Sequence, residues 1–289
     1  MLFRKNTEIV KSRAKINLSL KIVKTREDGY HELEMVMIPL ELHDIIEITR
    51  EPSLMDTYIT CDDVGLAHLH NNLCTKAVEA MRKEFGFKDN FNINIHKEIP
   101  FAAGLGGGSS NAAAVITSII KILNLKADPE VINRVALSIG ADVPFFIEGK
   151  PSFVTGLGEQ LKEISVKSTY HCLIVKPQKG LSTKEVYEVS DSCEKTSINS
   201  ADVLEALKMD DFAKLSASIG NDLYLPATQI LPEVKDVVEQ LKSAGFPVAA
   251  MTGSGSACFG LSKDAHFVKE AAKKFKNLGY VVRVTKTIN

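Results

Sequence analysis

An alternation of apolar and polar positions marks the first element of the chain. Between residues 14 and 22 every second residue is apolar, which is the twofold period of a half-buried β-strand. Lys15 and Asn17 fall between these apolar positions, so we expect them together on the polar face of the strand. Apolar and β-branched runs bounded by turn residues predict further strands at 34–40, 45–49, 58–61 and 91–96.

Apolar residues at helical spacing follow in the same half of the chain. They predict one helix directly after Asn72, a second across 115–123 and a third across 131–139 that ends at Gly140. We therefore expect a mixed sheet with several helices in this half.

The pattern restarts in the second half with a strand at 171–175. A capping box that begins at Ser182 predicts a short helix, and two further helical stretches cross 201–212 and 232–244. A strand at 248–251, a Gly/Ser turn, a strand at 257–261, a helix at 265–275 and a strand at 280–284 complete the chain. This order is typical of a ferredoxin-like sandwich. The predicted class is α+β, with domains at 1–155 and 156–289.

Composition and charge narrow the function. The 289 residues are 45% apolar and 25% charged, an ordinary globular composition, and 35 basic against 36 acidic residues leave a net charge of -1. Proteins that bind nucleic acids or anionic membranes usually carry an excess of basic residues, and this chain has none. No apolar run reaches the ~20 residues that a membrane span needs. Residues 1–11 lack a signal-peptide core. We expect a cytoplasmic protein whose five scattered cysteines are buried thiols.

A glycine-rich segment is the most informative stretch. Residues 100–114 read PFAAGLGGGSSNAAA, so that the chain passes four glycines and then enters a helix. Glycine lets the backbone approach a ligand closely, and a helix N-terminus favours an anion. The segment is neither a Walker A loop nor a dinucleotide fingerprint, because the lysine of the first and the third glycine of the second are missing. A glycine-rich helix cap without a ligand is the alternative, but four glycines in five residues exceed what a cap requires.

This segment resembles the phosphate loop of the galactokinase, homoserine kinase, mevalonate kinase and phosphomevalonate kinase (GHMP) superfamily. AKINL at 14–18 and MTGSGSACFG at 251–260 resemble two further motifs of that superfamily. REDGYHEL at 26–33, GADVPFF at 140–146 and GLGE at 156–159 resemble one of its families, the 4-diphosphocytidyl-2-C-methyl-D-erythritol kinases, in order and spacing over nearly the whole chain. One departure is Leu157, where many relatives have arginine.

The resemblance implies a fold and an activity. It implies an N-terminal mixed α/β domain, similar to ribosomal protein S5 domain 2, followed by the ferredoxin-like domain. It implies that ATP, with Mg²⁺, phosphorylates the 2-hydroxyl of 4-diphosphocytidyl-2-C-methylerythritol, a step of non-mevalonate isoprenoid precursor synthesis. The partner is then a small molecule, and the chain is expected to be a monomer or a homodimer.

The resemblance also assigns roles to residues, carried over position by position. Asp142 matches the catalytic residue of the family, and Lys15 matches a lysine that supports it at the reacting hydroxyl. The substrate would contact Asn17, Tyr30, His31, Thr183, Tyr187, Ser254 and Gly255. The nucleotide would contact Asn72, Lys97, Pro100, Gly104, Leu105, Gly106, Gly107, Gly108, Ser109 and Ser110, and the two serine hydroxyls would hold Mg²⁺.

Two other functions stay open on the sequence. One is a kinase of the same superfamily that acts on another small alcohol, and such a substrate would leave Tyr30, His31 and Tyr187 without a role. The other is a catalytically silent sensor, which the presence of both Lys15 and Asp142 disfavours. From the residues alone Asp142 could also be a turn residue ahead of a strand, and Lys15 a surface lysine. No function follows from the pattern of residues 190–211.

Overall fold

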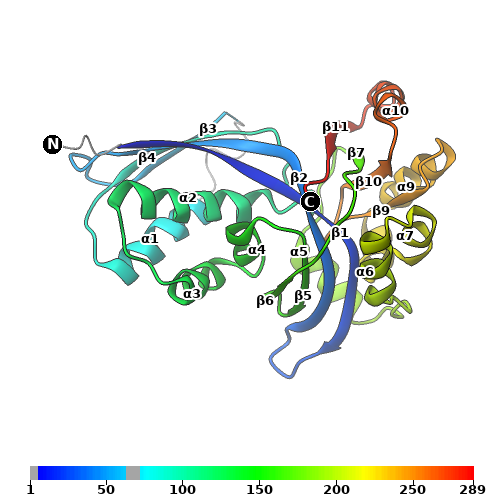
Figure 1. Cartoon of the computed structure of the whole chain (residues 1–289), viewed down its shortest axis with the longest axis horizontal. Helices are drawn as coiled ribbons and strands as arrows, with labels where there is room; N and C mark the ends of the chain where they lie inside the picture. Colours follow the sequence, from blue (N-terminus) through cyan, green and yellow to red (C-terminus); the bar gives the residue numbers. More distant parts are fainter. Residues whose placement is uncertain (1–5, 63–71) are drawn as a thin grey trace. The chain divides into compact units, whose positions relative to one another are not determined.

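The computed structural model describes residues 6–62 and 72–289, which form two compact units (Figure 1). Unit 1 takes in the described parts of Met1–Arg13, His43–Ile99 and Gly106–Gly149. Unit 2 consists of Ala14–Leu42, Pro100–Leu105 and Lys150–Asn289. Each unit collects separate stretches of the chain, so the division at residue 155 stays a prediction.

The sheet that begins the chain has the strand order β3-β4-β2-β1-β8. In unit 1, the end of β2 (His31–Arg50) pairs antiparallel with β4 (Phe91–His96), with Ile45 opposite His96. β3 (Tyr58–Cys61) runs parallel to β4. The long strands β1 (Thr7–Thr25) and β2 contribute residues to both units. The strand predicted over 14–22 is confirmed as part of β1.

The two strands predicted at 34–40 and 45–49 are wrong as separate elements, because β2 is continuous from His31 to Arg50. Its polar middle, residues 41–44, stays extended through partners that are distant in sequence. The Leu42 amide donates to Thr285 Oγ1, and the fully buried Asp44 carboxylate accepts from the amides of Glu98 and Ile99. These partners satisfy polar groups that otherwise end a strand.

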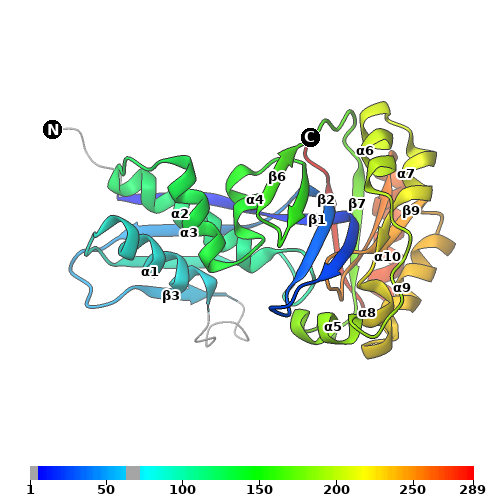
Figure 2. The same cartoon turned by 90° about the horizontal axis from the view of Figure 1, so that it is seen from below.

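Helices cover one face of the sheet in unit 1 (Figures 1 and 2). Their bounds are α1 (Leu73–Phe85), α2 (Gly107–Leu123), α3 (Pro129–Ile139) and α4 (Val143–Glu148). Asn72 caps α1 by accepting from the Cys74 amide at 2.9 Å, and α1 ends at Gly86 in the left-handed conformation. The predicted helix at 115–123 extends back to Gly107.

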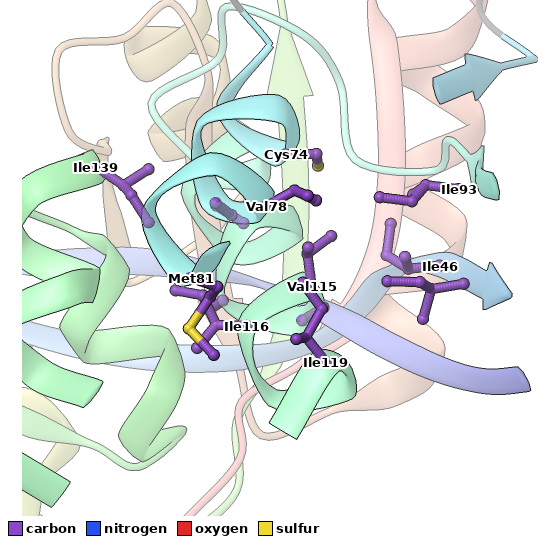
Figure 3. Close-up of a cluster of buried hydrophobic side chains, with 14 of the residues drawn as sticks. Ile46, Cys74, Val78, Met81, Ile93, Val115, Ile116, Ile119 and Ile139 are labelled. Atoms are coloured by element: carbon purple, nitrogen blue, oxygen red, sulfur yellow. The ribbon is translucent and has the colours of Figure 1, made fainter. Parts of the chain in front are cut away.

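Apolar side chains of the helices and the sheet of unit 1 form one core (Figure 3). Val78 and Met81 of α1 and Ile116 of α2 lie on its helical side, and Ile46 and Ile93 come from β2 and β4. Their exposed fractions are at most 1%. At about 25 cal/mol per Å² of apolar surface, this burial is the main force that holds α2 against the sheet.

Three elements between residues 140 and 165 were not predicted. Asp142 precedes the short helix α4 and not a strand, because Pro144 lies in the first turn, where a missing amide hydrogen costs nothing. β5 (Ser152–Gly156) and β6 (Gln160–Glu163) form a hairpin, and β5 pairs antiparallel with the first part of β2 in unit 2.

A second sheet lies in unit 2, with the antiparallel order β11-β7-β10-β9. The strands are β7 (His171–Lys176), β9 (Val248–Met251), β10 (Cys258–Ser262) and β11 (Val281–Lys286). α9 (Glu233–Ser243) and α10 (Ala265–Asn277) pack on it. β11, the last strand of this sheet along the chain, pairs with β7, the first. The predicted ferredoxin-like arrangement is therefore confirmed.

The other elements of unit 2 follow β7. α5 (Thr183–Ser190) begins at the predicted capping box, where Ser182 Oγ accepts from the Glu185 amide. The helix predicted over 201–212 is two helices, α6 (Ser200–Met209) and α7 (Phe212–Ser218), because Asp210 takes a left-handed conformation and Asp211 caps α7. β8 (Gly220–Asn221) pairs parallel with β1, and α8 (Tyr224–Ile230) follows.

Three of the five cysteines are buried as expected, whereas Cys61 and Cys193 are half-buried. All five thiols are free in the structure, and Cys74, Cys172 and Cys258 are buried. Burial raises the pKa of the Cys74 thiol to about 12, so it is protonated and unreactive at neutral pH. None of the helices built from the described residues is long and apolar enough to cross a membrane.

Candidate active site

The polar face of β1 is buried, which corrects the expectation of a half-buried strand. Lys15 is 4% exposed and Asn17 is 2% exposed. The Asn17 amide donates to Thr252 Oγ1 at 3.0 Å, so the turn that follows β9 covers this face of the strand. The sequence places Lys15 and Asn17 side by side, and the structure adds the turn, 235 positions away, that encloses them.

The Lys15 ammonium lies against that turn. Its Nζ donates to Asn17 Oδ1 at 2.6 Å, while the Lys15 backbone amide donates to the carbonyl oxygen of Leu105 at 3.0 Å. A Cβ atom on Gly253 would lie 3.2 Å from Lys15 Nζ and 2.7 Å from the Gly104 carbonyl oxygen. The close approach of the ammonium to backbone therefore requires glycine at position 253, where φ is +56°.

The turn at residues 252–256 is held by polar side chains of unit 2. Asn221 Nδ2 donates to the carbonyl oxygens of Met251 at 3.1 Å and Gly253 at 2.9 Å. The hydroxyls of Thr183 and Ser254 share a hydrogen bond of 2.9 Å, so two of the predicted substrate residues meet. The Gly253 and Ser254 amides donate to no acceptor within the part of the chain that the structure describes. Unpaired amides beside a lysine ammonium form a place for an anion.

A second group of predicted substrate residues gathers around His31. Its Nε2 lies 2.7 Å from Asp191 Oδ1, and its ring centroid lies 4.9 Å from that of Tyr187. Thr25 Oγ1 donates to the same carboxylate oxygen at 3.2 Å. The hydrogen bond from His31 lowers the pKa of the Asp191 carboxyl, which is therefore ionised at neutral pH. We call His31, Tyr187, Asp191 and Thr25 the imidazole cluster.

Tyr30 stands apart from the imidazole cluster, although it precedes His31 in the chain. It is 64% exposed, and its amide donates to Asp28 Oδ1 at 3.1 Å in the tight turn between β1 and β2. Its ring stacks on no other ring among the described residues. Tyr30 and Tyr187, both expected to contact the substrate, do not stack on each other, and the Tyr187 ring packs against His31.

The N-terminus of α2 in unit 1 has the geometry of an anion site. Gly106 at the N-cap has φ +72° and no side chain to accept a hydrogen bond, so the first amides of α2 are not capped. Ser12 Oγ donates to Ser110 Oγ at 2.7 Å or to Asn111 Oδ1 at 2.6 Å, which ties β1 to the first turn of α2. Open amides and the helix dipole together favour a phosphate at this end of the helix.

Lys97 adds a positive charge beside this helix start. Its ammonium forms an ion pair with Asp44, which is fully buried. A Cβ atom on Gly107 would lie 3.4 Å from Lys97 Nζ and 3.1 Å from Ile99 Cγ2, so Lys97 lies directly against the first residue of α2. Asn72, also predicted to contact the nucleotide, caps α1.

Asp142 lies at the N-terminus of α4 in the same unit and is half-buried. α4 packs against α2. A Cβ atom on Gly140 would lie 4.0 Å from Ser109 Oγ, so the segment that leads into Asp142 runs beside the first turn of α2. The candidate base and the candidate phosphate site are therefore built on neighbouring helix starts.

The two serines predicted to hold Mg²⁺ differ in environment. Ser110 is 3% exposed and its hydroxyl bonds Ser12, whereas Ser109 is half-buried. No three His, Cys, Asp or Glu residues among those described are grouped as metal ligands. Mg²⁺ in kinases is held by one or two protein groups together with substrate phosphates, so a hydroxyl beside an open helix start is a donor that fits it.

Sequence reasoning missed five residues that shape these sites. They are Ser12, Asp44, Asp191, Asn221 and Thr252. Thr252 lies inside a quoted motif and could have been singled out there. The other four bond to site residues between 30 and 166 positions away, and no local pattern signals such contacts.

Comparison with known proteins agrees with this architecture. The family models described as GHMP kinases N terminal domain and GHMP kinases C terminal match residues 72–150 and 203–281. A solved structure of homoserine kinase from Cytophaga hutchinsonii shares the fold, with a TM-score of 0.78 at 16% identity over 100% of this chain and 96% of that chain.

More similar relatives narrow the family. The 4-diphosphocytidyl-2-C-methyl-D-erythritol kinase of Caldanaerobacter subterraneus subsp. tengcongensis is 34% identical over 281 residues, 97% of this chain and 96% of the relative. The protein of the same name from Clostridioides difficile is 36% identical over 279 residues, 94% of each chain. A crystal structure of 4-(cytidine 5'-diphospho)-2C-methyl-D-erythritol kinase covers 98% of this chain and 100% of that chain, with 28% identity and a TM-score of 0.81. Identity at this level along almost the entire length shows that the chain belongs to the 4-diphosphocytidyl-2-C-methyl-D-erythritol kinase family of GHMP kinases.

Proposed function

We propose that this protein transfers the γ-phosphoryl group of ATP to the 2-hydroxyl of 4-diphosphocytidyl-2-C-methyl-D-erythritol, in non-mevalonate isoprenoid precursor synthesis. Beyond family membership, the observation that carries the proposal is the imidazole cluster, together with the exposed ring of Tyr30, the residue before His31 in the chain. Aromatic faces and an imidazole held by a carboxylate suit a nucleobase. An acceptor without a base would make no use of them.

Phosphoryl transfer requires a proton acceptor and positive charge at the reacting group, since it is mostly positioning and charge neutralisation. Asp142 is the proposed base that takes the hydroxyl proton, and Lys15 supplies positive charge to the oxygen from which that proton leaves. Asn17 supports this role of Lys15, because its amide oxygen accepts from Nζ and fixes the ammonium in one place.

The acceptor's phosphates are proposed to lie at the open amides of the turn at residues 252–256. Ser254 and Gly255 belong to this turn, and Thr183 holds the Ser254 hydroxyl. His31, Tyr30 and Tyr187 would contact the cytosine, with the two tyrosine rings providing stacking surfaces. This arrangement assigns the recognition of the base and of the diphosphate to separate elements of unit 2.

ATP is proposed to place its phosphates at the N-terminus of α2, with Lys97 as the cation beside them. Pro100, Gly104, Leu105 and Gly106 lead the chain into this helix start, and Gly107, Gly108, Ser109 and Ser110 form its first turn. Asn72 is proposed to contact the adenine. Mg²⁺, which Ser109 would hold with Ser110 as the less accessible second donor, supplies neutralisation of phosphate charge when bound. A cytoplasmic location and a monomer or homodimer are part of the proposal.

An assay with γ-labelled ATP tests the proposed function. The purified protein is offered 4-diphosphocytidyl-2-C-methylerythritol, mevalonate, homoserine and other cytidine diphosphate alcohols, and phosphorus NMR locates the new phosphate. We expect label only on the methylerythritol compound, at the 2-hydroxyl. The Asp142→Asn variant, purified in parallel, controls for contaminating kinases. Preference for mevalonate or homoserine would support another alcohol kinase, and binding without turnover would support a sensor.

A further inference from the structure

We infer that Asp191 is a positioning residue that holds His31 in the tautomer with the proton on Nε2, so that Nδ1 accepts a hydrogen bond from the exocyclic amino group of the base. The inference rests on the proposed function in that it takes the imidazole cluster as the site of the base. It adds a specificity determinant in the stretch 190–211, for which the sequence pattern indicates no role.

The hydrogen bond determines where the proton lies. Asp191 Oδ1 is 2.7 Å from His31 Nε2, and an ionised carboxylate can only accept. Nε2 must therefore carry the hydrogen. The His31 side chain is 8% exposed and Asp191 is 48% exposed, so the ring is enclosed while its partner stays in contact with water and keeps its charge. Thr25 Oγ1 donates to the same oxygen at 3.2 Å and restricts the carboxylate further.

The chain also fixes the plane of the ring. Tyr187 and Asp191 are four residues apart at the end of α5, the spacing that puts two side chains on one face of a helix. One helix end therefore presents an aromatic surface, with its centroid 4.9 Å from that of His31, and a carboxylate for its Nε2. A flip of the imidazole about its Cβ–Cγ bond would lose the bond to Asp191, and a tilt of its plane would also lose the contact with Tyr187.

A neutral imidazole has one donor and one acceptor, and with the proton on Nε2 the acceptor is Nδ1. Nδ1 has no partner among the residues that the structure describes. Cytosine presents an amino group at the position where uracil presents a carbonyl oxygen. An acceptor nitrogen bonds the amino group but faces the lone pairs of the carbonyl, so uracil would leave both groups unsatisfied.

Kinetics of an Asp191→Leu variant test the assignment. The ratio of kcat/KM for the cytidine substrate to that for its uridine analogue should fall about tenfold, the size of one mismatched hydrogen bond, through a higher KM for the cytidine compound with kcat little changed. Asp191→Asn retains an acceptor oxygen for Nε2 and should keep most of the preference. Glu188→Leu, which removes an exposed carboxylate of α5 outside the cluster, is the matched control and should keep all of it.

Two measurements test the inference without turnover. Nitrogen-15 NMR determines which nitrogen of the His31 ring carries the proton, and calorimetry with CDP and UDP measures the preference for the base. In the wild type we expect a protonated Nε2, a bare Nδ1 and a preference for CDP, and in Asp191→Leu a mixture of tautomers. A proton on Nδ1 in the wild type, or an unchanged CDP preference in Asp191→Leu, overturns the inference. A wild type that turns over no cytidine diphosphate alcohol would contradict the proposed function instead, while an Asp191-dependent CDP preference would still support the base site.

Discussion

Lys15 shows how one residue combines fold and chemistry. An ammonium that is 4% exposed costs free energy unless hydrogen-bond acceptors replace water, and the Asn17 amide oxygen at 2.6 Å provides one such acceptor. The turn at residues 252–256 buries Lys15 and Asn17, and the hydrogen bonds from Lys15 Nζ to Asn17 and from the Asn17 amide to Thr252 offset the cost of that burial. The proposed catalytic charge is built into the core of unit 2.

At the residue scale, we predict that Asp142→Asn lowers kcat by about 10² to 10⁴, the usual contribution of a positioned general base, with little change in the KM for ATP. The carboxamide keeps the shape of the carboxylate but cannot take the proton. Single-turnover kinetics check the effect, and Asp128→Asn at the N-cap of α3 is the matched control. Wild-type turnover in Asp142→Asn would remove Asp142 from catalysis.

A second prediction at this scale concerns Tyr30, whose exposed ring is available for stacking. Tyr30→Ala should weaken binding of the cytidine substrate by about 1 to 3 kcal/mol, a factor of about 5 to 150, and leave ATP affinity unchanged. Tyr30→Phe keeps the ring and serves as the control. Calorimetry that finds equal affinity in Tyr30→Ala and wild type would place the base elsewhere. Tyr187→Ala should cost more than ring stacking alone, because it also exposes the His31 ring.

At the scale of elements, the segment that leads into α2 is anchored in unit 2 by backbone contacts. The Lys15 amide donates to the Leu105 carbonyl oxygen, and the Ala257 amide donates to that of Ala103. Gly104 lies between these contacts with φ +70°, and a Cβ there would lie 2.2 Å from the Thr252 carbonyl oxygen. Glycine at 104 is thus required by packing as well as by conformation.

We predict that Gly104→Ala destabilises the protein by about 3 kcal/mol or more, the sum of left-handed strain and overpacking. Gly279 has φ +86° but no atom within 4 Å of its Cβ position. Gly279→Ala should therefore lower the free energy of unfolding by the left-handed strain alone, roughly 1 to 2 kcal/mol. Urea unfolding of both variants measures the difference. Equal losses would mean that the loop moves away from Thr252 at no cost.

The cap of α1 permits a further prediction, because Asn72 has a structural role and a proposed nucleotide contact. Asn72→Ala should lower stability by about 1 kcal/mol through loss of the bond to the Cys74 amide, whereas Asn72→Ser should keep the cap. If Asn72 contacts adenine, both variants raise the KM for ATP. A KM that rises only in Asn72→Ala would assign the residue to the fold alone.

For the whole molecule, the net charge of -1 provides no general attraction for two anionic substrates. Binding must then come from local groups, and the proposed ones are an open helix start with Lys97 in unit 1 and the amides of a turn beside Lys15 in unit 2. We propose one such anion site in each unit. Ligand binding at either should therefore be measurable as stabilisation of the folded chain.

We predict that ATP with Mg²⁺ at about 100 times its Kd stabilises the protein by about 2.7 kcal/mol, because the ligand binds the folded state alone. Scanning calorimetry should show Tm rising with nucleotide concentration. Removal of Mg²⁺ with a chelator should reduce the increase, since the phosphate charge is then unneutralised. An equal increase with the chelator present would exclude Mg²⁺ from the nucleotide complex.

Local patterns in the sequence were sufficient for the elements whose determinants are neighbours in the chain. The alternation at 14–22 predicts β1, and Asn72 and Ser182 mark the starts of α1 and α5, because a cap bonds amides two or three residues away. The motifs that identify the family are also contiguous, since a loop that approaches a phosphate uses consecutive backbone groups. The sequence by itself therefore determined the fold class, the family and the residue types of the candidate sites.

Tertiary structure decided what depends on distant partners. β2 runs unbroken through residues 41–44 because Thr285 and the segment after β4 satisfy its polar groups. Asp191 meets His31 across 160 positions, and Thr252 closes over Asn17 across 235. A hydrogen bond between such residues imposes no periodicity on either local segment, so the pattern of apolar and polar residues cannot predict it. Only the folded chain shows which polar residues hold the candidate catalytic groups in place.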